Sequence, residues 1–276
     1  MNEFYELQAP EYDTRIALCI EYDGSQFNGW QTQNSGVPTV QQELQQALSI
    51  IANHPVKVIC AGRTDSGVHA TGQIVHFDTN AKRKMYGWVV GANKLMEKTV
   101  SVKWAKEVPL SFHARFSARQ RRYRYLLYSS PFRQGILKNG VSWERRQLDA
   151  ELMNLAAKKL LGEHDFTSVR AAGCQAHSPI KKITNISVKK HGELIVMDIQ
   201  ANSFLYHMVR NILGLLIPIG AKEKPVDWIE SVILQKDRKV AGINALSDGL
   251  YFVDAIYDEH FDLPKTLPGP FFLGDI

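Results

Sequence analysis

The chain has 276 residues, 45% of them hydrophobic, which is enough for one large domain or two ordinary domains with real cores. Its 33 Lys and Arg against 28 Asp and Glu give a net charge of +5, an excess that fits nucleic-acid binding without requiring it. No apolar run is long enough to span a membrane, and residues 1–14 hold no apolar core of a secretion signal. Cys19, Cys60 and Cys174 are far apart, so neither a disulfide framework nor a Cys-x-x-Cys zinc site is indicated. These features predict a soluble, cytoplasmic protein.

The first part of the chain alternates short apolar runs with helical stripes. Strands are expected at residues 16–21, 56–60, 73–77 and 100–105, and helices at 40–51 and 85–96. Thr39 stands three residues before Gln42, the spacing of a capping box at the start of the first helix. The turn-rich stretch 23–38 is long for a structureless loop, and such loops are often functional. The order strand, helix, strand, strand, helix, strand predicts an α+β layer with helices on one face.

The second part repeats this outline after a connector at residues 109–118, although no residue-level repeat is visible. Strands are expected at 119–129, 183–190, 193–201 and 250–257, and helices at 148–161, 206–217 and 225–234. Residues 263–276, with three prolines, are expected to form an irregular tail. We therefore expect an N-terminal α+β half over residues 1–108 and a C-terminal α+β half over residues 109–276.

The segment 61–70, Ala-Gly-Arg-Thr-Asp-Ser-Gly-Val-His-Ala, is the strongest candidate for a functional site. It joins two expected strands, and its two glycines allow a close approach of the backbone to a ligand. A loop at a strand end is a common place to mount a catalytic side chain on a rigid scaffold. Asp65, kept ionised by its surroundings, could act as a nucleophile or base without a cofactor. The alternative is a polar turn with a surface pair of Arg63 and Asp65.

A second candidate is the basic strand at residues 119–129, where period two places Tyr123 with Arg121 and Tyr125 on one face. Aromatic side chains among arginines commonly stack an unpaired RNA base beside phosphate-binding charges, although a tyrosine in a strand is more often part of the core. The basic residues that could line a phosphate path are Arg63, Arg115, Arg119, Arg121, Arg122, Arg124, Lys181 and Lys182.

Two further side chains need a partner or an explanation. Arg210 borders an apolar helical stripe, where an unpaired charge would be costly unless its side chain reaches water. His69 follows Asp65 by four residues and would suggest a metal pair only if this loop were helical. No third ligand stands at a suitable spacing, and there is no P-loop or dinucleotide-binding fingerprint. We therefore expect no metal and no cofactor.

Several motifs together resemble the tRNA pseudouridine synthase A family, and they occur in that family's order along nearly the whole chain. They are Tyr22-Asp23-Gly24-Ser25 with Phe27, Gly29, Trp30 and Gln31, then Gly62-Arg63-Thr64-Asp65-Ser66-Gly67-Val68-His69-Ala70, Ser111-Phe112-His113-Ala114-Arg115-Phe116-Ser117-Ala118, Arg122-Tyr123-Arg124-Tyr125, Phe166, Arg170-Ala171-Ala172-Gly173-Cys174, Asn202, Phe204, His207-Met208-Val209-Arg210 and Gly249-Leu250-Tyr251. One departure is that Leu246 follows Ala245, where family members often carry proline.

The resemblance implies the pseudouridine synthase fold, in which two similar α+β halves form a continuous, mostly antiparallel sheet carrying helices and a central basic cleft. It implies an isomerase that converts uridine to pseudouridine at positions 38, 39 and 40 in the anticodon stem and loop of tRNA. It also implies a homodimer that needs no cofactor.

The same resemblance assigns roles to individual residues. Asp65 would be the nucleophile, paired with Arg210, which would lower the pKa of Asp65 and hold its rotamer. Tyr123 would meet the target uracil and Leu250 would pack against the same base. The remaining residues assigned to catalysis or RNA binding are Arg63, Arg115, Arg122 and Arg124.

Two other classes of function remain open from the residues themselves. One is a non-catalytic RNA-binding protein in which Arg63 and Asp65 form a structural pair. The intact set of Asp65, Arg63, Tyr123 and Arg210 argues against it. The other is a glycosidase or nucleoside hydrolase, which would need a second carboxylate near Asp65. Only Asp23 and Asp78 are candidates for that second carboxylate.

Overall fold

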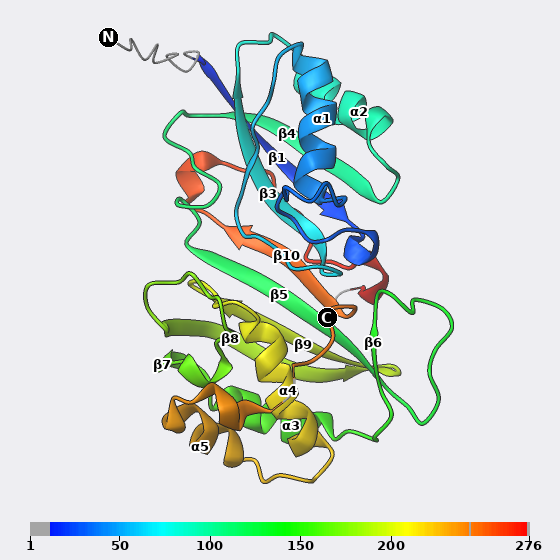
Figure 1. Ribbon diagram of the computed structural model, residues 1–276, viewed down its shortest axis with the longest axis vertical. Coiled ribbons are helices and arrows are strands. Elements are labelled where there is room, and N and C mark those ends of the chain that lie inside the picture. Colours follow the sequence, from blue (N-terminus) through cyan, green and yellow to red (C-terminus); the bar gives the residue numbers. More distant parts are fainter. Residues whose placement is uncertain (1–11, 243, 275–276) are drawn as a thin grey trace.

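The computed structural model describes residues 12–242 and 244–274 of the chain (Figure 1). The strands in this part are β1 (Thr14–Tyr22), β2 (Ile59–Cys60), β3 (His69–Thr79), β4 (Val100–Val108), β5 (Gln120–Ser129), β6 (Ser142–Glu144), β7 (Gly162–Asp165), β8 (Ile180–His191), β9 (Leu194–Ala201) and β10 (Leu250–Ile256). The α-helices are α1 (Val40–Ala52), α2 (Met85–Leu95), α3 (Ala150–Lys158), α4 (Met208–Gly220) and α5 (Trp228–Gln235).

All of these strands belong to one sheet, which runs through the length of the molecule in the order β4-β1-β3-β10-β5-β9-β8-β7, with β2 paired to β3 and β6 to β5. The pairs along this order are antiparallel except for β10 with β3. Near its end, the chain thus returns to the middle of the sheet. There Leu250 is in register with Tyr125 of β5, and Tyr251 with His69 of β3. The expected α+β fold with a continuous, mostly antiparallel sheet is confirmed.

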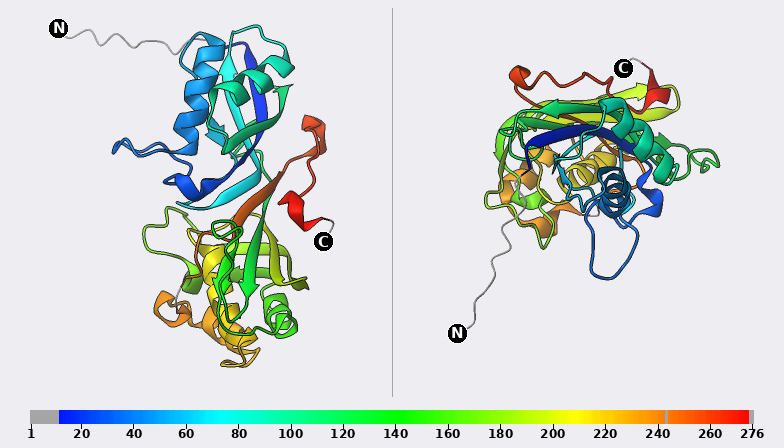
Figure 2. Two further views of the ribbon diagram at one scale, coloured as in Figure 1. Left: turned by 90° about the vertical axis from the view of Figure 1, so that its right-hand side faces the viewer. Right: turned by 90° about the horizontal axis from the view of Figure 1, so that it is seen from above.

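The helices cover one face of the sheet, and the C-terminal segment crosses the other face (Figure 2). On the helix face, α1 and α2 pack on the strands of the N-terminal part, with Trp88 meeting Phe77 at 5.0 Å between ring centroids. The helices α3, α4 and α5 close a second core over β5, β8 and β9. A smaller cluster on the opposite face joins Leu126 and Val253 to Leu273 of the C-terminal segment. Burial of these apolar side chains is the main stabilising term in such a fold.

The expected strand at residues 56–60 shrinks to the two residues of β2. The amides of Val56 and Val58 donate to side chains of α1, namely Ser49 Oγ at 2.9 Å and Gln45 Oε1 at 2.9 Å. A backbone donor used in this way is not available to a strand ladder. Two short polar strands, β6 and β7, were not expected, because neither carries an apolar alternation long enough to recognise.

Two element boundaries move toward the candidate site. The strand β3 begins at His69, four residues before its expected start, so His69 lies in the sheet and not in a helix. The helix α4 begins at Met208, and His207 just before it is in the left-handed region with φ 58°. Residues 1–14 were predicted to hold no apolar core of a secretion signal, and most of this segment lies outside the described residues. In the described part of the chain, no helix is long and apolar enough to cross a membrane.

Candidate active site

The loop that carries Asp65 is packed against the turn-rich N-terminal segment. A Cβ on Gly24 would lie 2.0 Å from the carbonyl oxygen of Val68, and one on Gly29 would lie 2.7 Å from that of Thr64. Gly29 also has φ +83°, a backbone conformation that favours glycine. The two glycines are therefore needed because this segment forms a close-fitting backing for the Asp65 loop.

Side chains fix the same loop from within the sheet. The fully buried Gln73 donates its amide to the carbonyl oxygen of Gly62 at 2.6 Å. The hydroxyl of Tyr22 and that of Thr64 lie 2.8 Å apart and share a hydrogen bond. The backbone on both sides of the loop is thereby held, so Asp65 projects from a rigid support, as a catalytic group requires.

The carboxylate of Asp65 meets the start of α4 through His207. The Nε2 atom of His207 lies 3.3 Å from Asp65 Oδ2. Arg210 lies one turn further along, with Nη1 3.5 Å from the same Nε2 and Nε donating to the carbonyl oxygen of Ala245 at 2.8 Å. The expected direct ion pair between Asp65 and Arg210 is therefore wrong in this structure, because His207 occupies the contact and a backbone carbonyl engages Arg210.

The pKa of Asp65 depends on the balance between burial and the neighbouring charges. Burial raises the pKa of Asp65, while the charges of His207 and Arg210 act in the opposite direction without outweighing it. Burial lowers the pKa of His207, and Arg210 and Arg238 lower it further. Arg210 thus lowers the pKa of Asp65 as expected, but the net shift is upward because loss of water around the carboxylate is the larger effect.

A cavity of about 130 Å³ opens beside this cluster. Tyr123 and Leu250 line it, as expected from the resemblance, and so does Phe204. The Tyr123 ring is held edge-on between Phe204 and Phe252, with centroid distances of 5.0 and 5.1 Å. Asp65 is the one carboxylate among the described residues that line the cavity.

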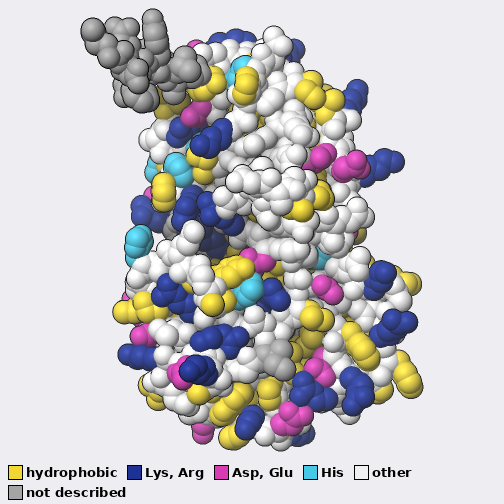
Figure 3. All heavy atoms as spheres, viewed as in Figure 1, with side chains coloured by type: hydrophobic (Ala, Val, Ile, Leu, Met, Phe, Trp, Pro, Cys, Tyr) yellow, Lys and Arg dark blue, Asp and Glu magenta, His cyan; other side chains and the backbone are white. Residues whose placement is uncertain are grey.

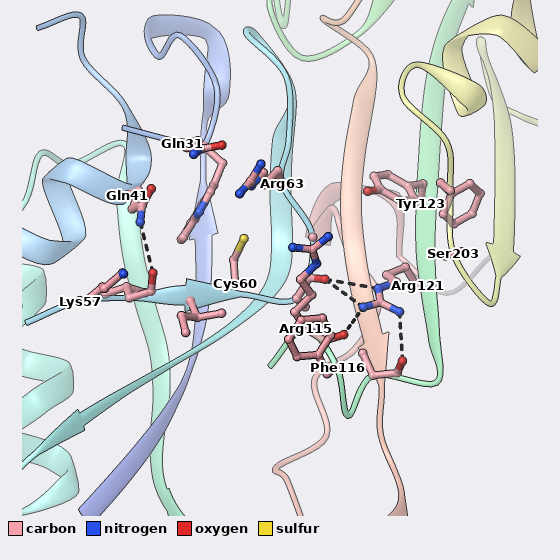
Figure 4. A pocket seen from close by; sticks show the side chains of 17 residues that line it. Gln31, Gln41, Lys57, Cys60, Arg63, Arg115, Phe116, Arg121, Tyr123 and Ser203 are labelled. Atoms are coloured by element: carbon pink, nitrogen blue, oxygen red, sulfur yellow. Dashed lines mark hydrogen bonds between the residues drawn. The ribbon is translucent and has the colours of Figure 1, made fainter. Parts of the chain in front are cut away.

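Two larger hollows adjoin the cavity, with volumes of about 720 Å³ and 780 Å³. Arg63 lines all three, so it stands where they meet. Figure 4 shows the 720 Å³ hollow, with Arg63, Arg115 and Arg121 around it and Tyr123 at one end. On the face that carries the helices, Lys and Arg side chains gather around a hollow midway along the molecule (Figure 3). The central basic cleft expected from the resemblance is present.

The connector after β4 forms one wall of the 720 Å³ hollow. His113 accepts hydrogen bonds at Nδ1 from the amides of Arg115 and Phe116, and its ring stacks on Phe116 at 4.4 Å. The guanidinium of Arg115 lies 5.5 Å from the Phe116 ring centroid, and Phe116 is 76% exposed. His76 of β3 accepts from the amide of Ala114 at 3.1 Å, which ties the connector to the sheet. Arg115 and Phe116 are thus presented to solvent on a fixed turn.

Arg122 and Arg124 do not reach the cleft, which corrects their expected place among the RNA-binding residues. Both are paired with Asp198 of β9, at 2.7 and 2.8 Å, on the face away from the helices. Arg124 is 3% exposed and also donates to the carbonyl oxygens of Pro268 and Gly269 in the C-terminal segment. The alternation along β5 sends their side chains to the opposite face from Tyr123.

Of the other basic residues considered for a phosphate path, some are already engaged by groups of the protein and some are not. Arg121 faces the cleft but donates to backbone carbonyl oxygens, including that of Ala61 at 3.1 Å. Arg119 pairs with Asp258 at 2.7 Å, and the amine of Lys181 donates to the carbonyl oxygen of Ser178. Arg63 and Arg115 take part in none of the ion pairs found within the described residues.

The departure at Leu246 leaves the local backbone anchored. The hydroxyl of Tyr125 donates to the carbonyl oxygen of Leu246 at 2.8 Å. The amide of Ala245 donates to the carbonyl oxygen of Arg210 at 3.2 Å, and Arg210 returns a bond from its side chain. These hydrogen bonds fix the path toward Gly249 without the ring constraint of proline.

The structure adds His207, Asn244 and Arg238 to the site, and sequence reasoning assigned none of them a role. Only His207 gave a usable signal, because it stands three residues before Arg210 and so shares a face with it at the start of a helix. Asn244 and Arg238 come from the segment after α5, and nothing in their local pattern marks them.

No group of three or more His, Cys, Asp or Glu within residues 12–242 and 244–274 could hold a metal ion. His69 lies in β3, stacked on Tyr251 at 4.7 Å, and its Nδ1 faces the amide of Gly24. Asp23 lies beside that histidine, whereas Asp78 forms a two-point pair with Arg15. Neither of these carboxylates lines the cavity at Asp65.

Comparison with known proteins shows the family to which the chain belongs. The family model described as tRNA pseudouridine synthase matches residues 18–117 and 156–258. Curated relatives named tRNA pseudouridine synthase A include one from Pseudoalteromonas atlantica, 55% identical over 95% of this chain and 99% of its own length. Another, from Vibrio parahaemolyticus, is 54% identical over 95% of this chain and 98% of its own length. A third, from Shewanella amazonensis, is 54% identical over 95% of this chain and 100% of its own length.

The chain therefore belongs to the tRNA pseudouridine synthase family. It is an isomerase that makes pseudouridine from uridine in tRNA.

Proposed function

We propose that this enzyme acts on uridines 38, 39 and 40 in the anticodon stem and loop of tRNA, with Asp65 as the nucleophile. The observation that carries the proposal is the small cavity beside Asp65, which is lined by Tyr123 and Leu250 and by a single carboxylate among the described residues. Enzymes that act on a base move it out of the stack into a close-fitting pocket of this kind.

The size and lining of the cavity favour a single base. Its volume of about 130 Å³ is that of roughly four waters of the bulk liquid, too little for a whole nucleotide. Tyr123 offers an aromatic surface for stacking, and Leu250 an apolar one. The sugar and the phosphates would then lie in the adjoining hollows, where Arg63 and Arg115 supply positive charge.

The reaction needs no redox step. The bond between N1 and the sugar C1′ breaks, a bond from C5 to the same carbon forms, C5 loses its proton and N1 gains one. A carboxylate nucleophile can form a covalent intermediate, which divides one difficult step into two easier ones. Hydrolytic glycosidases usually use two carboxyl groups, so the single carboxylate at this cavity weighs against a nucleoside hydrolase.

Arg210 has a supporting part in this proposal. Its charge favours the ionised form of Asp65, which burial alone would disfavour. Because Nε is fixed to the carbonyl oxygen of Ala245, the guanidinium stays near His207 and the carboxylate. Arg63, at the junction of the three hollows, would bind the RNA beside the target nucleotide.

We also propose that the enzyme works in the cytoplasm as a homodimer. Its three cysteines are free thiols, which fits a reducing compartment. A second basic surface at a fixed distance from the cleft would let one tRNA touch both chains, since the anticodon arm occupies only one end of the molecule. The N-terminal half over residues 1–108 would supply Asp65, and the half over 109–276 would supply Tyr123 and Arg210.

The test is the Asp65→Asn variant assayed on unmodified tRNA, with pseudouridine mapped by position. We expect turnover to fall by at least about 10²-fold, because a covalent or acid–base group is lost, while tRNA affinity stays near that of the unchanged enzyme. Asp23→Asn is the matched control, since Asp23 lies outside this cavity and should keep full turnover. Turnover above about one hundredth in Asp65→Asn would remove Asp65 from the essential role, and product elsewhere in the tRNA would refute the anticodon-arm assignment.

A further inference from the structure

The side chain of His207 bridges the carboxylate of Asp65 and a residue far along the chain. Its Nε2 atom lies 3.3 Å from Asp65 Oδ2, and its Nδ1 atom lies 3.1 Å from the amide nitrogen of Asn244. His207 occupies the left-handed region with φ 58°, a conformation uncommon outside glycine, although Asn, Asp and His adopt it more often than other residues. Strained backbone of this kind is retained mainly where the side chain has to reach a defined position.

The orientation of the Asn244 amide is fixed by its other neighbour. Arg238 Nη2 donates to Asn244 Oδ1 at 2.6 Å, and Nη1 of the same guanidinium donates to the carbonyl oxygen of Gly242 at 3.0 Å. A guanidinium has donors and no acceptor, so the oxygen of the Asn244 amide must face Arg238. The NH₂ group of Asn244 therefore faces His207.

This orientation determines the tautomer of His207. The Nδ1 atom accepts a hydrogen bond from Asn244, so in the neutral ring the proton sits on Nε2, which faces Asp65 Oδ2. The contact between Nε2 and Arg210 Nη1, at 3.5 Å, then joins two donors and is not a hydrogen bond, and Arg210 uses the carbonyl oxygen of Ala245 instead.

The charges around the ring agree with a neutral histidine. The groups that face it are Asp65 on the Nε2 side, Arg210 from α4 and Arg238 behind Asn244. Burial lowers the pKa of His207, both arginines lower it further, and only Asp65 raises it, with a net lowering. Near neutral pH, His207 is thus an uncharged donor to the carboxylate.

We propose that Asn244 and Arg238 are positioning residues, which hold His207 in the Nε2–H tautomer so that it donates to Oδ2 of Asp65. This inference rests on the proposed role of Asp65. The donated hydrogen bond favours the ionised carboxylate against the burial that disfavours it, and it fixes the rotamer. Because the donating ring is neutral, it places no full positive charge beside the nucleophile. Hydrogen bonds through His207 thereby connect Asp65, in the loop between β2 and β3, to the segment between α5 and β10.

The first measurement is the ¹⁵N NMR spectrum of the enzyme labelled in its histidine rings, with His207 assigned through His207→Gln. We expect the His207 signals of a neutral ring protonated at Nε2. A ring protonated at Nδ1, or at both nitrogens at pH 7.5, would overturn the inference without any substitution. Because the spectrum does not depend on turnover, its outcome is separate from that of the Asp65→Asn assay.

The second measurement is the single-turnover rate of Asn244→Asp with saturating tRNA. An aspartate keeps the bond to Arg238 but accepts from Nδ1–H, so the neutral ring presents a lone pair to Asp65. We expect a rate loss of roughly tenfold or more with little change in tRNA affinity, as for other residues that orient a catalytic group. The His207 signals should move to the Nδ1–H tautomer or to a ring protonated at both nitrogens.

Lys239→Gln is the matched control, because it removes a charge from the same segment at an exposed position. It should leave the single-turnover rate unchanged. An Asn244→Asp enzyme with the full rate would overturn the inference. A slow variant whose fall in rate is matched by Lys239→Gln would do the same, since the effect would then belong to the segment and not to the tautomer.

Discussion

The two faces of strand β5 use the same residue types for different purposes. Toward the helices, Arg121 and Tyr123 line the cleft. Toward the C-terminal segment, Arg122 and Arg124 close on Asp198, and Arg124 is 3% exposed. One face therefore presents charge and an aromatic ring to the cleft, and the other uses charge to hold the chain end against the sheet.

The difference teaches that a basic strand cannot be assigned to nucleic acid as a whole. What decides is whether a carboxylate stands opposite in the neighbouring strand. Asp198 is in register with Arg124 in β9, so the arginines on that face are already satisfied. No carboxylate is among the described residues that line the 720 Å³ hollow beside Tyr123. An arginine whose charge is used within the protein adds little to phosphate binding.

The largest effect is expected from Asp198→Ala, which removes the carboxylate from the face that holds the chain end. Arg124 would be left buried and uncompensated, so the free energy of unfolding should fall by about 3–5 kcal/mol. Urea unfolding measures the change. Asp258→Ala, which breaks the exposed pair with Arg119, is the matched control and should cost at most about 1 kcal/mol. Equal losses in the two variants would contradict the structural role of the Asp198 cluster.

A second prediction compares the pH response of two buried titratable groups, Asp254 on the face of the chain end and His76 in β3. On the face of the chain end, burial raises the pKa of Asp254 to about 6 from 3.8. Between pH 6 and 4 the folded state binds a proton there that the unfolded state does not, so stability rises as the pH falls. In β3, under the connector of residues 109–118, burial lowers the pKa of His76 to about 4 from 6.5. Over the same interval the unfolded state binds a proton on His76 that the folded state does not bind. The free energy of unfolding therefore decreases as the pH falls.

The two responses oppose each other in the unchanged protein, and single variants should reveal each. Asp254→Asn should be more stable at pH 7.5 by about 2 kcal/mol and should lose stability steadily toward pH 4. His76→Asn, which keeps an acceptor for the amide of Ala114, should instead gain stability over that interval. Urea unfolding at several pH values gives both curves. Parallel curves for the two variants would mean that Asp254 and His76 do not set the pH dependence in this way.

The sequence was sufficient for most of the fold, because the elements that matter have clear periodicity. The amphipathic stripes of α1 and α4 and the apolar run of β1 are strong local signals, and the structure confirms the order of the elements. The predicted strand boundaries were wrong where backbone amides donate to side chains, as at Val56 and Val58 before β2. The place of β10 in the middle of the sheet was not predicted, because no local pattern of residues 250–257 determines which strands they pair with.

The candidate site was predictable only in part. Asp65, Tyr123, Leu250 and Arg210 come together as expected, because each belongs to a motif of the resemblance. The sign of the Asp65 pKa shift was not predictable, since it depends on burial by side chains from distant parts of the chain. For the same reason Asn244 had no signal: its contact with His207 spans the length of α4 and α5.

The smallest effect concerns RNA affinity and compares Arg115 on the cleft side with Arg122 on the other face. Arg115 is exposed on the fixed turn beside Phe116, whereas Arg122 has both ends of its guanidinium on Asp198. If Arg115 neutralises one phosphate, Arg115→Ala should weaken tRNA binding about three- to tenfold at low salt. It should also reduce the slope of log affinity against log salt by somewhat under one unit. Arg122→Ala should leave that slope unchanged. Binding titrations over a range of salt concentrations distinguish the two, because loss of a phosphate contact changes the slope whereas a general weakening of the protein does not. An equal change of slope in both variants would mean that RNA reaches the face of the chain end, and the contrast between the two faces of β5 would fail.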